Sequence, residues 1–324
     1  MNLIKEYLAR HAWVVRLANK LKIKGHYGRV IRIEDKHVIY FINFLNEFYP
    51  SLHVNLLDCG ALWGLKLCGI YSALAHLKNK TVHGIECNEE EAAKLRASGE
   101  YDQVYCEAVA GYTGEATLYV HEYKQLTSLK EYNPSFSDLF IANAPDQVNP
   151  IKVKVKALNE VLDKNVHYDF LKLNIEAIEL DLLKSLNDTF YDSVYAIYTE
   201  SQPMEIYKDA HMFDELLVWA REHHFMLLNV YNISFGPQID NHILLVKDPR
   251  SIQTIDDLLK FYFIGILSKD PDFCMYMLCM WYKKFGMHKC LDVLARQLGC
   301  SSFKDYWDFF FFFSRGEYAG TCQP

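Results

Sequence analysis

Residues 53–64 read HVNLLDCGALWG: a short apolar run, the acidic residue Asp58, and then two glycines. The run 53–57 predicts a buried β-strand, and the apolar spacing of residues 65–77 predicts a helix after it. Gly60 and Gly64 lie in the connection, where glycine lets the backbone pass close to a ligand. The start of a helix adds backbone N–H groups that have no partner inside the helix. The stretch therefore predicts a ligand-binding turn at the carboxyl end of a strand.

The same alternation continues toward the C-terminus. Strands are predicted at 81–86 and 103–109, with a helix at 89–98 between them, and this βαβαβ order is typical of a parallel sheet covered on both faces. Glu86 ends the second strand, 22 residues after Gly64. A carboxylate at that place can accept hydrogen bonds from both ribose hydroxyls of an adenosine-type cofactor. Alone, each feature fits a tight turn or a solvated acid; together they predict a nucleoside site.

Further strands are predicted at 116–121, 151–155, 169–173, 193–198, 225–231 and 242–246, with helices at 158–162, 177–186 and 213–223. Ten residues separate the last two strands, too few for a crossover helix, so these strands should pair antiparallel. The predicted fold is α/β and Rossmann-like, with a seven-stranded, mostly parallel sheet whose last strand is antiparallel.

The glycine pattern restricts the cofactor. The dinucleotide fingerprint GxGxxG is absent because position 62 is Leu, and the phosphate-binding loop GxxxxGK[ST] is absent as well. Asp58 in the turn would repel a phosphate, but it would suit the cationic end of S-adenosyl-L-methionine. The sequence therefore favours S-adenosyl-L-methionine over a dinucleotide or a nucleoside triphosphate.

Composition excludes several classes of protein. Of the 324 residues, 51% are hydrophobic and 23% charged, which is too apolar for a disordered chain. The net charge is −7, and the basic stretch 1–33 leaves the remainder more acidic still, which argues against a nucleic-acid partner. Nine cysteines without a CxxC pair argue against a zinc site and favour a reducing compartment. With no secretory signal and no long apolar run, we expect a cytoplasmic protein.

Four stretches resemble, in order and spacing, the FkbM family of methyltransferases. They are residues 58–64, residues 84–88 (GIECN), residues 108–111 (AVAG) and residues 171–180 (LKLNIEAIEL). The resemblance covers roughly residues 53–247 and implies a class I methyltransferase that uses S-adenosyl-L-methionine. It also implies O-methylation of a hydroxyl on a sugar or another small metabolite. The sequence departs from the family at Asn174, where the family usually has Asp, and at Ala177, where it usually has Gly.

Candidate site residues lie at the carboxyl ends of the predicted strands, where open α/β sheets bind ligands. Those expected to hold the cofactor are Asp58, Gly60, Ala61, Gly64, Glu86, Cys87, Glu107 and Ala108. Methyl transfer from an activated cofactor depends largely on positioning, but a hydroxyl acceptor must still lose its proton to a base or through a metal.

The catalytic candidates come from the motif 171–180. Glu176 is the first choice for a base or a metal ligand, and Asn174 could orient the acceptor. Glu179 can share a helix face with Glu176, although it would also be favourable simply as an acid in a first helical turn. Lys172 either binds substrate or forms an ion pair with Glu200. A divalent metal stays an open question, because Asn is a poorer ligand than Asp.

The expected organisation is a helical segment at 1–50, the methyltransferase domain at 51–249 and a helical extension at 250–324. The expected partner is a small-molecule or glycan acceptor. One alternative is a catalytically impaired relative that still binds the cofactor. Another is a membrane-surface or self-associating protein that uses the basic N-terminal helix predicted at 3–21 and the Phe-rich helix predicted at 303–313.

Overall fold

The computed structural model describes residues 33–122, 124–136, 148–232, 241–298 and 302–304. They divide into two compact units. The larger unit spans Leu45–Ser251, and the smaller one combines residues 33–44 with the described residues from 252 onward. The basic segment 3–21 and the Phe run 309–313, on which the surface alternatives depend, lie outside the described residues.

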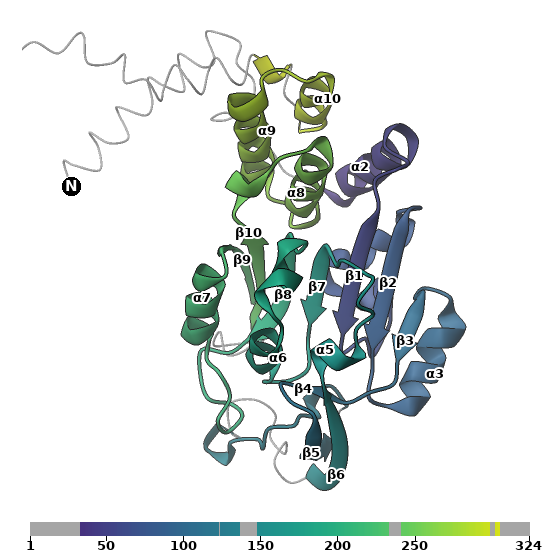
Figure 1. Ribbon diagram of the computed structural model, residues 1–324, viewed down its shortest axis with the longest axis vertical. Helices are drawn as coiled ribbons and strands as arrows, with labels where there is room; N and C mark the ends of the chain where they lie inside the picture. Colours follow the sequence, from purple (N-terminus) through teal and green to yellow (C-terminus); the bar gives the residue numbers. More distant parts are fainter. Residues whose placement is uncertain (1–32, 123, 137–147, 233–240, 299–301, 305–324) are drawn as a thin grey trace, which may run out of the picture. The chain divides into compact units, whose positions relative to one another are not determined.

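A seven-stranded sheet forms the centre of the larger unit, in the order β3-β2-β1-β7-β8-β10-β9 (Figure 1). The strands are β1 (Val54–Cys59), β2 (Lys80–Ile85), β3 (Gln103–Tyr105), β7 (Phe170–Leu173), β8 (Ala196–Ser201), β9 (Phe225–Asn232) and β10 (Asn241–Lys247). Strand β10 runs antiparallel to both of its neighbours, whereas β3, β2, β1, β7 and β8 are parallel. The predicted Rossmann-like sheet with an antiparallel last strand is confirmed.

One face of this sheet carries a hydrophobic row. The register places Leu57, Leu171, Ile197 and Leu245 side by side on adjacent strands, and all four are fully buried. They belong to one core with apolar residues of α5 (Leu158–Val161), α6 (Glu179–Ser185) and α7 (Phe213–Glu222). Because side chains alternate along a strand, the next row, which includes Asp58, Lys172 and Tyr198, faces the opposite side.

The opposite face differs from the prediction. Residues 65–77 were expected to form one α-helix, but the structure has two 3₁₀ segments, η1 (Leu65–Leu67) and η2 (Gly69–His76). Gly69, the first residue of η2, has a φ of 54°, and a Cβ there would lie 2.3 Å from the Tyr198 ring. The positive φ is incompatible with a right-handed α-helix at this residue, and the close approach to Tyr198 restricts the position to glycine. Within η2, Tyr71 stacks on Phe170 with ring centroids 5.3 Å apart.

A second, three-stranded sheet has the order β4-β6-β5, with β4 (Val109–Ala110), β5 (Gly114–His121) and β6 (Val148–Ala157). The strand predicted at 103–109 is therefore wrong as a single element, because it divides into β3 in the large sheet and β4 in this one. In Figure 1 the small sheet lies below the carboxyl ends of β1 and β7. It thus borders the edge where a ligand is expected.

The smaller unit is helical. It contains α8 (Ile255–Leu267), α9 (Pro271–Phe285), α10 (Lys289–Gln297) and most of α2 (Asp35–Phe48). A Cβ on Gly265 would lie 2.5 Å from the Cys274 sulfur, so glycine permits α8 and α9 to approach closely. Phe41 packs against Tyr262 and Phe263, with ring centroids 5.1 and 5.4 Å away. No helix among the described residues is long and apolar enough to cross a membrane.

Candidate active site

The turn after β1 approaches the end of β7 very closely. Gly60 and Gly64 have φ values of 75° and 82°, a region that glycine adopts without strain. A Cβ on Gly60 would lie 1.9 Å from the carbonyl oxygen of Asn174. The Gly60 and Ala61 N–H groups donate to the Ile85 carbonyl at the end of β2. The turn therefore joins the ends of three adjacent strands.

Below this turn lies a buried ion pair. The Lys172 ammonium is 3.0 Å from Asp58 Oδ1, and the Tyr101 hydroxyl donates to Asp58 Oδ2 at 2.7 Å. Lys172 Nζ also donates to the Gly60 carbonyl at 2.6 Å. Burial lowers the pKa of Lys172, but the Asp58 carboxylate together with the neighbouring Cys68 and Cys59 raises it, and the net pKa lies above its usual value. Lys172, for which we considered Glu200 as a partner, thus pairs with Asp58 and fixes the turn from beneath.

Glu86 lies at the end of β2, where the sequence placed it. Its side chain is buried, with 7% of the residue exposed, and Oε1 accepts the Asn88 N–H at 2.7 Å. Burial raises the pKa of Glu86, and the Asn88 hydrogen bond partly opposes this. A buried carboxylate that is costly to ionise gains from further hydrogen-bond donors, such as vicinal hydroxyls.

The neighbouring end of β3 contributes the other cofactor candidates. The Cys106 thiol lies 3.9 Å from the Cys87 carbonyl, which brings the residues after β2 and β3 together. Glu107 is paired with Lys156 of β6 at 2.5 Å, and the Ala108 carbonyl accepts the Lys156 N–H. Glu107 and Ala108 therefore anchor the second sheet beside the site.

The turn after β7 departs from the predicted helix. Glu176 and Ala177 have positive φ values of 55° and 76°, which no α-helix accommodates, so α6 begins at Glu179 rather than at residue 177. The Asn174 N–H donates to the Cys59 carbonyl, and Glu179 Oε1 accepts the Ile175 N–H at 2.9 Å. The Glu179 carboxylate thus closes the turn. The structure brings Asn174 and Glu176 to the same strand edge as the glycine turn.

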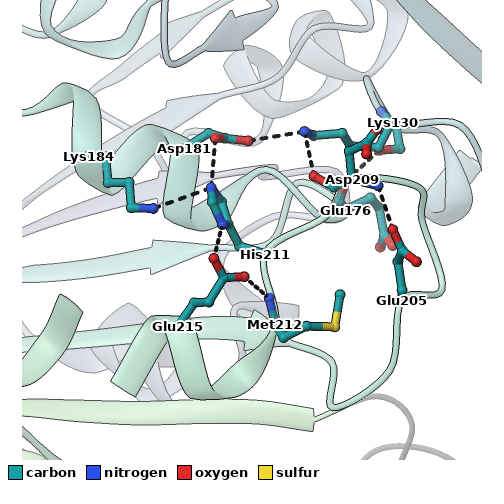
Figure 2. Close-up of polar contacts among 10 residues, drawn as sticks. Lys130, Glu176, Asp181, Lys184, Glu205, Asp209, His211, Met212 and Glu215 are labelled. Carbon is teal, nitrogen blue, oxygen red and sulfur yellow. Dashed lines mark hydrogen bonds and ion pairs between the residues drawn. The ribbon is translucent and has the colours of Figure 1, made fainter. Parts of the chain in front are cut away.

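Two residues that sequence reasoning did not single out as site residues lie beside this turn. The Tyr207 hydroxyl donates to Glu176 Oε2 at 3.0 Å. His211 Nε2 is 3.2 Å from Asp181 Oδ1, and its Nδ1 is 2.9 Å from Glu215 Oε1 (Figure 2). Both belong to the connection between β8 and α7, which has no periodicity and no motif, so no sequence signal could have found them.

A small cavity of about 10 Å³ lies at the same end of the sheet. Its lining includes Ala177, Glu179, Glu200 and His211. The space is about that of one water molecule. Among the described residues, no group of three or more His, Cys, Asp or Glu side chains is arranged to hold a metal ion.

Comparison with solved structures gives methyltransferases at low identity. Magnesium protoporphyrin IX methyltransferase from Synechocystis, solved with bound S-adenosylmethionine, is 10% identical over 65% of this chain and 78% of its own, with a TM-score of 0.30. TrmK from M. capricolum, solved with S-adenosylhomocysteine, is 10% identical over 85% and 98%, with a TM-score of 0.31. The 1,6-didemethyltoxoflavin N1-methyltransferase from Burkholderia thailandensis is 12% identical over 73% and 89%, with a TM-score of 0.32.

No curated protein matches the sequence. A family model, the methyltransferase FkbM domain, matches residues 58–227, which is just over half of the chain. The match begins at Asp58 and includes the glycine turn, Glu86 and the turn after β7. The strand order of the seven-stranded sheet agrees with that assignment. The chain belongs to the FkbM family of methyltransferases.

Proposed function

We propose that this methyltransferase moves a methyl group from S-adenosyl-L-methionine to a hydroxyl of a sugar or another small metabolite. The observation that carries the cofactor assignment is Glu86, a buried carboxylate at the end of β2, directly beside the glycine turn. The hydroxyl acceptor is supported by Glu176, a carboxylate at the end of the neighbouring strand β7.

The residues present suit this cofactor. Glu86 would accept hydrogen bonds from the ribose hydroxyls, with Cys87 and Ala108 beside the base. The Gly60 turn would lie near the methionine portion, and the position requires glycine because a Cβ there would lie 1.9 Å from the Asn174 carbonyl oxygen. Asp58 supports the turn through Lys172 rather than binding the cationic end directly, since both of its oxygens already face Lys172 and Tyr101.

When bound, the cofactor supplies a methyl group on a sulfonium, which is already activated for displacement. The chain then has to align the acceptor and remove its proton. In that reaction the Glu176 carboxylate would receive the proton that the acceptor hydroxyl loses. Asn174 orients the acceptor from the same turn.

A catalytically impaired relative is the second candidate, favoured by the turn itself. Ala177 has a φ of 76° where the family usually has Gly, and Asn174 replaces a carboxylate. Such a protein would bind S-adenosyl-L-methionine and transfer nothing. Turnover, rather than cofactor binding, separates the two candidates.

The first experiment is calorimetric titration with S-adenosylmethionine and S-adenosylhomocysteine. Glu86→Ala is the test variant, and Glu90→Ala is a matched control, because Glu90 is an exposed acid paired with Lys94. We expect micromolar binding that Glu86→Ala abolishes and Glu90→Ala preserves. Absence of binding by folded wild-type protein would refute the cofactor assignment. Asp58→Ala is unsuitable here, because it breaks a buried ion pair as well.

A screen would identify the methyl acceptor. It combines methyl-labelled S-adenosylmethionine with hydroxylated compounds, including monosaccharides and oligosaccharides. Label that is transferred to a hydroxyl, and lost with Glu176→Gln, supports O-methylation. Transfer to a nitrogen instead would refute the proposed acceptor while leaving the methyltransferase intact.

A further inference from the structure

Two segments distant in sequence pair beside the turn that holds Glu176. They are residues 128–133, after β5, and residues 204–209, after β8, and we call them together the paired segments. The Asn133 N–H donates to the Ile206 carbonyl at 2.7 Å, and the Lys208 N–H donates to the Glu131 carbonyl at 2.8 Å. The Lys208 ammonium also lies 2.6 Å from Glu131 Oε1. The segments are therefore fixed to each other by both backbone and side chains.

From the paired segments, two hydroxyl groups reach Glu176. The Ser128 hydroxyl donates to the Glu176 carbonyl at 2.5 Å, and it accepts the Lys130 N–H at 2.9 Å. The Tyr207 hydroxyl donates to Glu176 Oε2 at 3.0 Å. Both hydroxyl-bearing residues are buried, and Tyr132 packs edge-to-face on the Tyr207 ring. The Tyr207 bond goes to a carboxylate, and hydrogen bonds to a charged group are stronger than those between neutral groups.

The backbone at Glu176 requires such support. A side chain other than glycine at positive φ is strained, and here two consecutive residues, Glu176 and Ala177, adopt it. Strained backbone persists only where the surrounding structure determines it, and this condition is common at active sites. Ser128 holds the backbone of the strained turn, and Tyr207 holds the carboxylate that projects from it.

Charged contacts fix the ends of the paired segments to α6 and α7. Lys130 donates to the Asp209 carbonyl at 2.9 Å and lies 3.6 Å from Asp181 of α6 (Figure 2). His211 connects Asp181 with Glu215 of α7, as the same view shows. These contacts tie Asp209 and His211, which follow Tyr207 in the chain, to α6 and α7.

We propose that Tyr207 and Ser128 are positioning residues for Glu176, which hold its carboxylate in the orientation that receives the acceptor's proton. The inference rests on the proposed function, in which Glu176 is the base. It adds residues outside the family's strand-end motifs, contributed by two loops, and it predicts that removing one hydroxyl slows the chemical step without weakening the binding of the cofactor.

The test compares Tyr207→Phe with Tyr132→Phe. The second variant is the matched control, because it removes one hydroxyl group from the other ring of the same pair. The first readout is the side-chain carboxyl resonance of Glu176 in protein labelled with ¹³C-glutamate, assigned with Glu176→Gln. We expect this resonance to move in Tyr207→Phe and to stay in Tyr132→Phe. The second readout is methyl transfer to a hydroxylated acceptor from the screen. We expect kcat to fall about 10-fold in Tyr207→Phe, the effect of one hydrogen bond to a charged group, with KM for S-adenosylmethionine unchanged.

Each outcome decides the inference. An unmoved resonance in Tyr207→Phe, or a moved one with unchanged kcat, overturns it while the wild-type enzyme remains a methyltransferase. Wild-type protein that neither binds cofactor nor transfers a methyl group refutes the proposed function first, and the inference falls with it. If Tyr207→Phe does not fold, Ser128→Ala supplies the same comparison, since it removes the donor to the Glu176 backbone, and the same loss of kcat is expected.

Discussion

The buried pair Asp58–Lys172 should contribute more to stability than any other single ion pair of the larger unit described here, and Lys172→Met tests this. Both side chains are nearly inaccessible, with 1% and 9% exposed, and their charged atoms lie 3.0 Å apart. Removing one partner leaves the other charge buried without its counterion, which costs about 3–5 kcal/mol. The Gly60 and Cys59 carbonyls lose their lysine donor as well. We therefore expect a loss of about 4 kcal/mol.

A double-mutant cycle isolates the interaction. Asp58→Asn keeps the size and the Tyr101 hydrogen bond but removes the charge, so alone it should also cost about 3–5 kcal/mol. With Asp58→Asn and Lys172→Met together, no buried charge remains unpaired. The double variant should therefore be more stable than the sum of the two single effects predicts, by about 2 kcal/mol or more.

Hydrogen exchange read by mass spectrometry is the suitable assay, because the chain has two units and a global transition would mix them. Peptides that cover β1 and β7 report the opening free energy at the pair itself. Peptides from α8 and α9 provide an internal control, since their protection should change little. A loss below about 1 kcal/mol in Lys172→Met, or strict additivity in the cycle, would refute the reasoning that the pair is desolvated and coupled.

Three further predictions follow from single residues. Gly60→Ala places a methyl group 1.9 Å from the Asn174 carbonyl oxygen, on a residue whose φ is positive. The midpoint of thermal unfolding should therefore fall by several degrees, and cofactor binding should weaken. An unchanged midpoint would mean that the turn relaxes freely. Desolvation and the Glu86 carboxylate raise the pKa of Cys87 to about 12, so iodoacetamide should alkylate this thiol slowly at pH 8. Bound S-adenosylhomocysteine should slow the alkylation further. Equal alkylation rates with and without this ligand would place the cofactor elsewhere. Burial and then Asp58 raise the pKa of Tyr101 above its usual 10.0, so its contribution to stability is present below pH 10 and is lost as the pH rises above that value. Urea unfolding between pH 9 and 11 should show this loss in wild type and a smaller one in Tyr101→Phe, and identical slopes would contradict it.

Much of the sheet could be predicted from the sequence, because its signals are local. Apolar runs of five or six residues followed by glycine or an acidic residue mark the ends of β1 and β2, and the short connection between β9 and β10 excludes a parallel pair. The position of Glu86 followed directly from this alternation. The partner of Lys172 did not, because the pair depends on the register that sets Asp58 beside Lys172 across 114 positions of sequence.

The errors arose where tertiary packing overrides local preference. Residues 65–77 have helical apolar spacing, yet Gly69 has a positive φ and lies against the Tyr198 ring, and the stretch forms two 3₁₀ segments. The helix predicted from residue 177 starts at Glu179, because the backbone at Glu176 is held by Ser128. Tyr207 lies in a loop without periodicity, so its contact with Glu176 is visible only in three dimensions.

The two departures from the family have different consequences for the turn after β7. Asn174 contacts its neighbours through backbone atoms, which any residue would supply. Its N–H donates to the Cys59 carbonyl, and its own carbonyl lies against Gly60. Replacing the usual Asp therefore leaves the geometry intact and alters only the chemistry of one side chain. Of the two nearby carboxylates, that of Glu179 in α6 closes the turn through the Ile175 N–H, whereas that of Glu176 lies in the turn itself and accepts the Tyr207 hydroxyl; the proposal assigns the base to Glu176.

Ala177 alters the energetics instead. A residue other than glycine at this φ costs about 1–2 kcal/mol, and the buried methyl group, packed in a cluster with Ile206, Tyr207 and Ala210, returns about 0.8 kcal/mol. The remaining strain has to be offset by contacts from outside the turn, and the hydrogen bonds from Ser128 and Tyr207 are placed to do so. In this chain, where Ala177 replaces the family's usual glycine, the paired segments bond to the turn. In the proposed function, the position of the Glu176 carboxylate therefore depends on the two loops as well as on the strand-end motif.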